Sequence, residues 1–278
     1  MFKRTESFLE GITYYCEDAL YAGDDFAFVL DGASSVTHER ITEAATDAVW
    51  FVERWKDYLK TALARNTEIL PIMISGAEKI AAEYSSFPGA GSVGDKPSAA
   101  VSIVRVKNNY LEYFSLCDTV ILVRYKNGKC DYILDERLVV LDNENFERVK
   151  ELCRKTGGTP VRNFPQVFPY VYQNRNKMNT PGGYAALSHT TDGLETALTG
   201  RIAADGVRDI LLFSDGFAQS YDLFGIYKTP YEMIEDVSRS GIKKTVKKLQ
   251  DAQDADPEGV AFVRNKKGDD IAVVYIGL

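Results

Sequence analysis

Residues 98–135 decide the fold, and their sequence is SAAVSIVRVKNNYLEYFSLCDTVILVRYKNGKCDYILD. Apolar residues lie here in short runs, and two pairs of turn residues, Asn108-Asn109 and Asn127-Gly128, separate these runs. Asn-Gly between such runs is the strongest short-range signal of a β-hairpin. We therefore predict a meander of consecutive antiparallel strands in this region.

Helices and further strands are expected on both sides of the meander. Apolar residues at helical spacing predict four helical regions, over 41–63, 68–85, 145–155 and 230–250, the last of them in two stretches. Short apolar runs predict strands at 11–15, 26–30, 210–213 and 271–276. Hairpin-connected strands with helices on their faces form an α+β fold. Because the first and last strands are expected in the same body, we predict a single domain spanning 1–278.

The composition excludes several classes of protein. A hydrophobic content of 45% in 278 residues is typical of a globular chain with a sizeable core. The 33 Lys+Arg and 40 Asp+Glu residues give a net charge of −7, which disfavours binding to nucleic acid. No apolar run approaches the length of a membrane span, and the first residues lack the apolar region of a secretory signal. Four scattered cysteines without a CxxC pair are typical of reduced thiols in a cytoplasmic protein. The oligomeric state stays open.

Two motif-like features are weak signals. The GxGxxG stretch at 89–94 follows an expected helix, whereas a dinucleotide site needs a strand before it. A catalytic triad would have to combine His38 or His189 with Ser34 or Ser214, but no GxSxG motif exposes a serine. With only two histidines, a metal in this protein would be held mainly by oxygen atoms.

The informative residues are aspartates at the ends of apolar strands. The run at 26–30 ends in Asp31-Gly32, the run at 210–214 ends in Asp215-Gly216, and Asp269-Asp270 precede the run at 271–276. If neighbouring strands are antiparallel, the three carboxylates converge at one edge of the sheet. Unpaired carboxylates would repel one another and raise one another's pKa. A hard divalent cation such as Mg²⁺ or Mn²⁺ removes this cost.

The ordered motifs of the chain resemble those of the PP2C (PPM) family of metal-dependent serine/threonine protein phosphatases. The matching segments follow the family's order over nearly the whole chain: Tyr15-Cys16-Glu17-Asp18-Ala19, Phe28-Val29-Leu30-Asp31-Gly32, Pro97-Ser98-Ala99-Ala100-Val101, Ser115-Leu116-Cys117-Asp118-Thr119, Leu212-Phe213-Ser214-Asp215-Gly216 and Gly268-Asp269-Asp270-Ile271-Ala272-Val273. Two substitutions distinguish this chain within the motifs, because Pro97 and Cys117 stand where the family usually has glycine.

This resemblance implies a fold and a function. The family fold is a four-layer αββα sandwich of two mainly antiparallel sheets flanked by helices, which agrees with the strand pattern. The implied activity is hydrolysis of phosphoserine or phosphothreonine in proteins by a metal-activated water, with no protein nucleophile. Residues 159–183, which contain four prolines and are expected to be irregular, correspond to the family's substrate flap.

The resemblance also implies the site residues, with Mn²⁺ or Mg²⁺ as the cofactor. Asp31 would bridge two ions, the Gly32 carbonyl would hold one of them, and Asp215 and Asp269 would hold the other. Asp118 would match a ligand of a third, weaker ion. Glu17 and Asp18 would orient metal-bound water from behind these ligands.

Three departures from the family pattern leave alternatives open. Ala33 replaces a histidine that is a candidate general acid, Thr13 replaces an arginine that contacts phosphate, and Gln219 replaces a third-metal aspartate of some members. A catalytically weak or inactive phosphopeptide-binding regulatory module on the same fold therefore remains an alternative. An N-terminal nucleophile amidohydrolase, which has similar layers, would need cleavage before Thr5 or Ser7.

Overall fold

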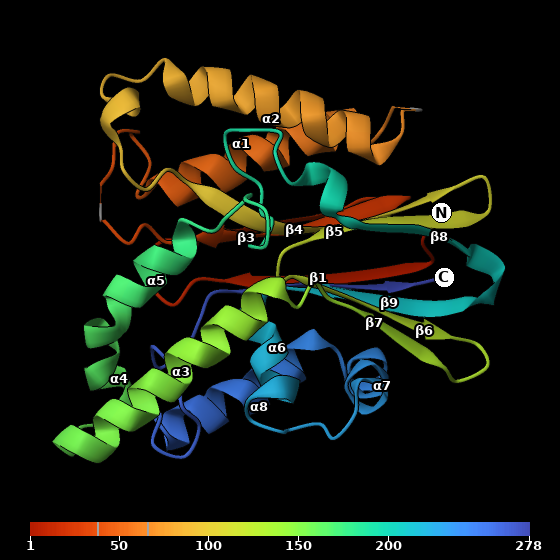
Figure 1. Ribbon diagram of the computed structural model, residues 1–278. Coiled ribbons are helices and arrows are strands. Elements are labelled where there is room, and N and C mark those ends of the chain that lie inside the picture. Colours follow the sequence, from red (N-terminus) through yellow and green to blue (C-terminus); the bar gives the residue numbers. More distant parts are fainter. Residues whose placement is uncertain (38, 66) are drawn as a thin grey trace.

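The computed structural model describes residues 1–37, 39–65 and 67–278. Two five-stranded sheets pack face to face, and helices cover both outer faces (Figure 1). In the described residues, all neighbouring strands of the two sheets pair antiparallel. The predicted α+β sandwich of four layers is confirmed.

The first sheet has the strand order β2-β3-β4-β5-β8. Its strands are β2 (Asp18–Ala22), β3 (Phe26–Ala33), β4 (Ser98–Lys107), β5 (Tyr110–Leu116) and β8 (Leu198–Ala203). The hairpin between β4 and β5 turns at Asn108 and Asn109, which both have positive φ angles. Asparagine tolerates this left-handed conformation better than most residues, so the turn signal in the sequence is confirmed.

The second sheet has the strand order β1-β10-β9-β6-β7. Its strands are β1 (Arg4–Glu10), β10 (Ile271–Gly277), β9 (Val207–Phe213), β6 (Val120–Tyr125) and β7 (Cys130–Ile133). Because β1 pairs with β10 along its whole length, the first and last strands of the chain lie in one sheet. The Asn-Gly turn joins β6 to β7 as predicted.

Apolar side chains fill three layers between these elements. Helices α1 (Asp47–Ala62) and α2 (Ile69–Ser85) cover the first sheet and correspond to two predicted helices. The second sheet is covered by α6 (Asp215–Asp222), α7 (Pro230–Ser240) and α8 (Ile242–Ala255). Between the sheets lies a buried layer of small and branched residues that includes Val29, Ile121, Leu212 and Val274.

The remaining helices lie beside one end of the sandwich, drawn in green in Figure 1. They are α3 (Arg137–Thr156), α4 (Pro160–Asn163) and α5 (Phe168–Arg175), with a 3₁₀ turn at Phe164–Val167. The expectation that 159–183 is irregular is therefore wrong for its first half. Each of its first three prolines occupies the first or second position of a helical segment. There the fixed φ of proline suits the helix, and its missing N–H is not needed.

Three further expectations about elements are wrong. The strand expected at 11–15 is a loop, and the strand lies before it as β1. The meander is interrupted after β5, because the chain crosses at 117–119 from the first sheet to the second. The helix expected at 145–155 already begins at Arg137. Strands β2 and β8 and helix α6 were not predicted; β8 has no fully buried residue, and α6 is short.

Other sequence features have ordinary structural explanations. The glycine-rich stretch at 89–94 follows α2 and contains only a 3₁₀ turn, so no strand precedes it. All four cysteines are free; Cys117 is buried and the other three are half-buried. No helix in the described parts of the chain is both long and apolar enough to cross a bilayer.

Candidate functional site

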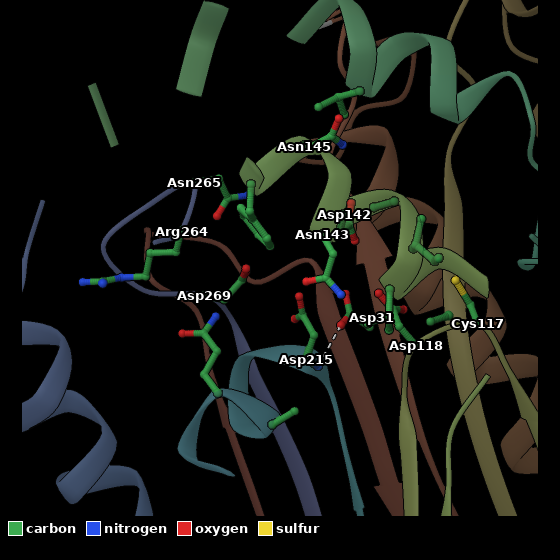
Figure 2. A pocket seen from close by; sticks show the side chains of 18 of the residues that line it. Asp31, Cys117, Asp118, Asp142, Asn143, Asn145, Asp215, Arg264, Asn265 and Asp269 are labelled. Atoms are coloured by element: carbon green, nitrogen blue, oxygen red, sulfur yellow. Dashed lines mark hydrogen bonds between the residues drawn. The ribbon is translucent and has the colours of Figure 1, made fainter. Parts of the chain in front are cut away.

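A cavity of about 920 Å³ opens at the end of the sandwich beside α3 and α5. Aspartates from several elements line it, and Figure 2 shows Asp31, Asp118, Asp215 and Asp269 around the same space. The four predicted ligand carboxylates are thus brought together. More than 230 residues separate Asp31 from Asp269 along the chain, so only the tertiary fold can bring the four side chains together.

Strand β3 provides Asp31 and Gly32. Asp31 lies opposite Asp18 of β2 in the register, and Asp31 Oδ2 accepts a hydrogen bond from the backbone N–H of Asp215 at 3.3 Å. The backbone N–H of Gly32 donates to the carbonyl of Glu17 at 3.0 Å. A Cβ atom at position 32 would collide with that same carbonyl oxygen. Glycine therefore permits the close approach that fixes the end of β3 beside the loop before β2.

The second sheet provides Asp215 and Asp269. Asp215 is the first residue of α6, directly after β9, and Asp269 precedes β10. The two ends are held together because Ser214 N donates to the Ala272 carbonyl at 2.9 Å. The prediction of convergence at one sheet edge is right for these two residues. It is wrong for Asp31, which reaches the cavity from the facing sheet.

Asp118 lies where the chain crosses between the sheets, after β5. The preceding residue, Cys117, has a φ of 67°, in the left-handed region that glycine adopts without steric cost. This explains in physical terms why glycine is usual at this position in the family that the motif resembles. Asp118 and Asp31 both line the cavity, and the charge of Asp118 is one of the causes that raise the pKa of Asp31 (Figure 2).

Glu17 and Asp18 lie behind the cavity and do not line it. Glu17 Oε1 accepts from the Thr46 hydroxyl at 2.6 Å, and Glu17 Oε2 accepts from the Ser34 hydroxyl. Asp18 is 4% exposed, and its Oδ2 has no hydrogen-bond partner among the described residues. A buried carboxylate oxygen without a partner is costly, so this atom points to a missing cation or water.

The electrostatics of the site favour bound positive charge. Burial is the largest cause that raises the pKa of each ligand aspartate, and the charges of neighbouring aspartates raise it further. The pKa of Asp215 rises to about 6 and that of Asp269 to about 7. The pKa of Asp31 rises well above its ordinary value. A cation in the cavity would relieve this repulsion between ionised groups.

Sequence reasoning missed three functional candidates that line the cavity: Asp142 of α3, Arg175 of α5 and Lys266 of the loop before β10. Burial and the charges of Asp118 and Asp215 raise the pKa of Asp142 to about 7. Arg175 donates to the Ser98 hydroxyl at 3.0 Å and therefore ties α5 to β4.

Lys266 lies on the acidic side of the cavity. Its Nζ lies 2.6 Å from Asp269 Oδ1. No sequence signal distinguished these three residues from ordinary surface charges, because they lie on a helix or in a loop rather than at a strand end.

The donor chemistry of the site fits Mg²⁺ or Mn²⁺, since every candidate ligand is a hard oxygen atom. The orphaned Oδ2 of Asp18 and the mutual repulsion of the aspartates point the same way. The side-chain positions, however, contain no group of three or more His, Cys, Asp or Glu residues that could hold a metal ion; this holds for residues 1–37, 39–65 and 67–278. Lys266 neutralises Asp269 instead.

The geometry of the described residues contradicts a serine-based triad built on Ser214 or on His189. Ser214 is fully buried, and its hydroxyl donates to the Ala272 carbonyl at 3.4 Å. His189 packs against Phe51 and Tyr84 in the first helical layer and does not line the cavity. His38 lies outside the described residues.

Comparison with solved structures identifies the fold. PppA, a regulatory component of the type VI secretion system of Pseudomonas aeruginosa, matches with a TM-score of 0.58 and 15% identity, over 99% of this chain and 96% of PppA. MsPP, a PPM Ser-Thr phosphatase from Mycobacterium smegmatis solved with cacodylate, matches with a TM-score of 0.57 and 12% identity, over 100% of this chain and 99% of MsPP. The chain has the PPM phosphatase fold.

A third solved structure with this PPM fold contains metal. It is the catalytic domain of the serine/threonine phosphatase PstP in complex with two manganese ions, with a TM-score of 0.53 and 14% identity over 99% of this chain and 97% of PstP. At the level of sequence, no family model and no curated protein matches the chain. The likeness to PPM phosphatases therefore lies in the fold and in the short acidic motifs that the fold brings together.

Proposed function

We propose that this protein is a Mn²⁺- or Mg²⁺-dependent phosphomonoesterase that removes phosphate from phosphoserine or phosphothreonine in proteins. The observation that carries this proposal is the convergence of Asp31, Asp118, Asp215 and Asp269 on one cavity of a PPM fold. The two manganese ions of PstP support metal dependence, and the fact that MsPP and PstP are serine/threonine phosphatases supports the substrate class.

The proposed ligands are those expected from the sequence. Asp31 would be shared between two ions, with the Gly32 carbonyl on one of them and Asp215 and Asp269 on the other. Asp118 would contribute to a third. When bound, two divalent ions offset the charge of a phosphate dianion and lower the pKa of a water molecule.

The remaining tasks belong to the chain itself. Glu17, held by the hydroxyls of Ser34 and Thr46, fixes the loop before β2 against β3. Asp18 supplies a buried carboxylate next to Asp31. The helices α3 and α5 form the outer wall of the cavity, which limits access of bulk water and offers contacts to residues flanking the phosphate. Since the Ser214 hydroxyl is buried and bonded, the attacking group would be water.

Turnover of an aryl phosphate tests the proposal directly. We expect hydrolysis of p-nitrophenyl phosphate with Mn²⁺, none with a chelator, and a loss of at least about 100-fold in Asp215→Asn. The matched control is Asp254→Asn, because Asp254 is an exposed carboxylate that pairs with Lys267 outside the cavity. Equal activity with chelator, or full activity of Asp215→Asn, would reject the proposal. If turnover depends on Mn²⁺ and on Asp215, activity on phosphopeptides would define the substrate class.

Binding without turnover is the second candidate function. The ion pair of Lys266 with Asp269 favours it, because a lysine already neutralises one proposed ligand. The absence of the family's histidine and arginine at Ala33 and Thr13 favours it too. Calorimetry distinguishes the two functions: a binding module would take up a phosphopeptide but hydrolyse none of it in the presence of Mn²⁺.

A further inference from the structure

The side chain of Lys266 has an unusual environment for a lysine. It is 40% exposed, lines the cavity, and pairs with Asp269. Burial opposes the charge of Lys266, but the charges of Asp269, Asp215 and Asp31 outweigh burial and raise its pKa. All three of these aspartates are proposed metal ligands, so the ammonium group stands within the electrostatic reach of the whole proposed metal site.

The other cationic side chains that line the cavity are engaged elsewhere. Arg264 donates to Asp256 Oδ2 and to the Phe262 carbonyl, and Figure 2 shows its guanidinium directed away from the aspartates. Arg175 donates to Ser98 and to a backbone carbonyl. Lys150 pairs with Glu147 at 2.6 Å on the exposed surface of α3. Lys266 differs from all of these, because its ion pair is with a residue of the acidic site itself.

A cation bound at Asp269 and Asp215 would change the position of Lys266. The carboxylate of Asp269 would be neutralised by the ion, and the like charges of the ion and the ammonium would repel each other. The four-carbon stem of lysine allows its ammonium to move several ångströms at low cost. A phosphate dianion in the cavity would then be the strongest available partner.

We propose that Lys266 is the phosphate-binding residue of this site: its ammonium pairs with Asp269 in the absence of ligands and with a non-bridging phosphate oxygen of the substrate when metal is bound. This inference rests on the proposed function. It assigns the positive charge that the site lacks at Thr13, and it uses a residue of the loop before β10 rather than the loop before β2.

Three variants test the assignment. Lys266→Met removes the charge and keeps most of the length, Lys266→Arg keeps the charge, and Lys267→Met is the matched control. Lys267 is the neighbouring residue, pairs with Asp254 at 2.6 Å, and does not line the cavity. The measurements are calorimetric affinity for inorganic phosphate in the presence of Mn²⁺, affinity for Mn²⁺ alone, and KM and kcat for p-nitrophenyl phosphate.

We expect Lys266→Met to weaken phosphate binding and to raise KM by about tenfold or more, the usual effect of losing one charge-assisted hydrogen bond. We expect it to bind Mn²⁺ more tightly than the wild type, since the competing ammonium is gone. Lys266→Arg should retain phosphate affinity to within about threefold, and Lys267→Met should match the wild type in every measurement.

Two results would overturn the assignment. One is equal phosphate affinity in Lys266→Met and Lys267→Met. The other is weaker Mn²⁺ binding by Lys266→Met together with a lower thermal stability and an unchanged KM, which would indicate a purely structural ion pair. Failure of the proposed function looks different, because the wild type itself would then show no Mn²⁺-dependent turnover. If the Mn²⁺-loaded wild type hydrolyses p-nitrophenyl phosphate but binds no phosphate, only the assignment of Lys266 is rejected.

Discussion

Replacing Asp215 by asparagine should stabilise the protein when no metal is present. Burial disfavours the ionised form of Asp215 most, and the charges of Asp118 and Asp222 disfavour it further. Asparagine has nearly the same shape and carries no charge. It also leaves in place the backbone hydrogen bond from residue 215 to Asp31. A substitution that removes a proposed metal ligand should therefore raise stability, contrary to the usual effect of changing a buried polar residue.

The pKa of Asp215 gives the magnitude and the pH dependence. Its rise from 3.8 to about 6 corresponds to roughly 3 kcal/mol at most, at about 1.4 kcal/mol for each pKa unit. Because the pKa is raised in the folded state, the folded protein keeps a proton that the unfolded chain has lost between about pH 4 and pH 6. Stability therefore falls as the pH rises through this range. The advantage of asparagine is fully present above about pH 7 and disappears as the pH approaches 4.

Urea denaturation in EDTA at several pH values measures this effect. We expect Asp215→Asn to exceed the wild type in free energy of unfolding at pH 7.5, with a gain that shrinks steadily toward pH 4. Addition of Mn²⁺ should reverse the order, because only the wild type keeps the complete ligand set. A variant that is less stable than the wild type in EDTA at pH 7.5, or a gain that is independent of pH, would refute the reasoning.

Three further outcomes are expected. Mn²⁺ at about 100 times its Kd should stabilise the wild type by about 2.7 kcal/mol in thermal unfolding, and a chelator should abolish this gain; an unchanged Tm would argue against a metal site. Gly32→Ala should lower the free energy of unfolding by about 1–3 kcal/mol and abolish most Mn²⁺-dependent turnover, because its Cβ meets the Glu17 carbonyl. Gly91→Ala, which has open space around it, should behave as the wild type, and equal stability of the two variants would contradict this prediction. Arg124→Met should lower the free energy of unfolding in urea by about 3–5 kcal/mol, since it leaves Asp209, 1% exposed, without its ion-pair partner. Arg124→Met combined with Asp209→Asn should recover part of that loss, and a loss under about 1 kcal/mol in the single variant would show that the ion pair contributes little.

The parts of the fold that depend on local pattern could be predicted from the sequence. The hairpin turns at Asn108 and at Asn127-Gly128 were predicted, since their residues tolerate the required backbone angles. The helices α1 and α2 follow directly from apolar periodicity. The crossing of the chain between sheets after β5 could not be predicted, because the strands on both sides have the same apolar character. Only packing against other elements decides which sheet each strand joins.

The helical conformation of residues 160–175 was missed for a related reason. Proline is a poor helix former inside a helix but a good one in the first turn. Pro160, Pro165 and Pro169 each stand in the first or second position of a separate short segment, and a sequence pattern alone does not show where one short segment ends and the next begins. Contacts with α3, including the packing of Phe164 near Val149, stabilise these segments in the fold.

The residues of the candidate site also fall into those that the sequence pattern predicts and those that it does not. Asp31, Asp215 and Asp269 were found because each stands at the end of an apolar strand, and strand ends are fixed by the sheets. Asp142 and Lys266 were missed because their positions depend on where α3 and the loop before β10 pack, which no local pattern encodes.

The missed residues change the chemistry expected of the site. The strand-end aspartates alone would form an acidic cavity suited only to metal ions. With Lys266 beside Asp269, the cavity carries its own cation within the electrostatic field of the aspartates. Ionised carboxylates that are buried reduce the stability of the metal-free protein. The positive charge of Lys266 offsets part of that loss. Under our proposal, the lysine that pairs with Asp269 in the metal-free protein would also be the one that binds a phosphate once metal is bound.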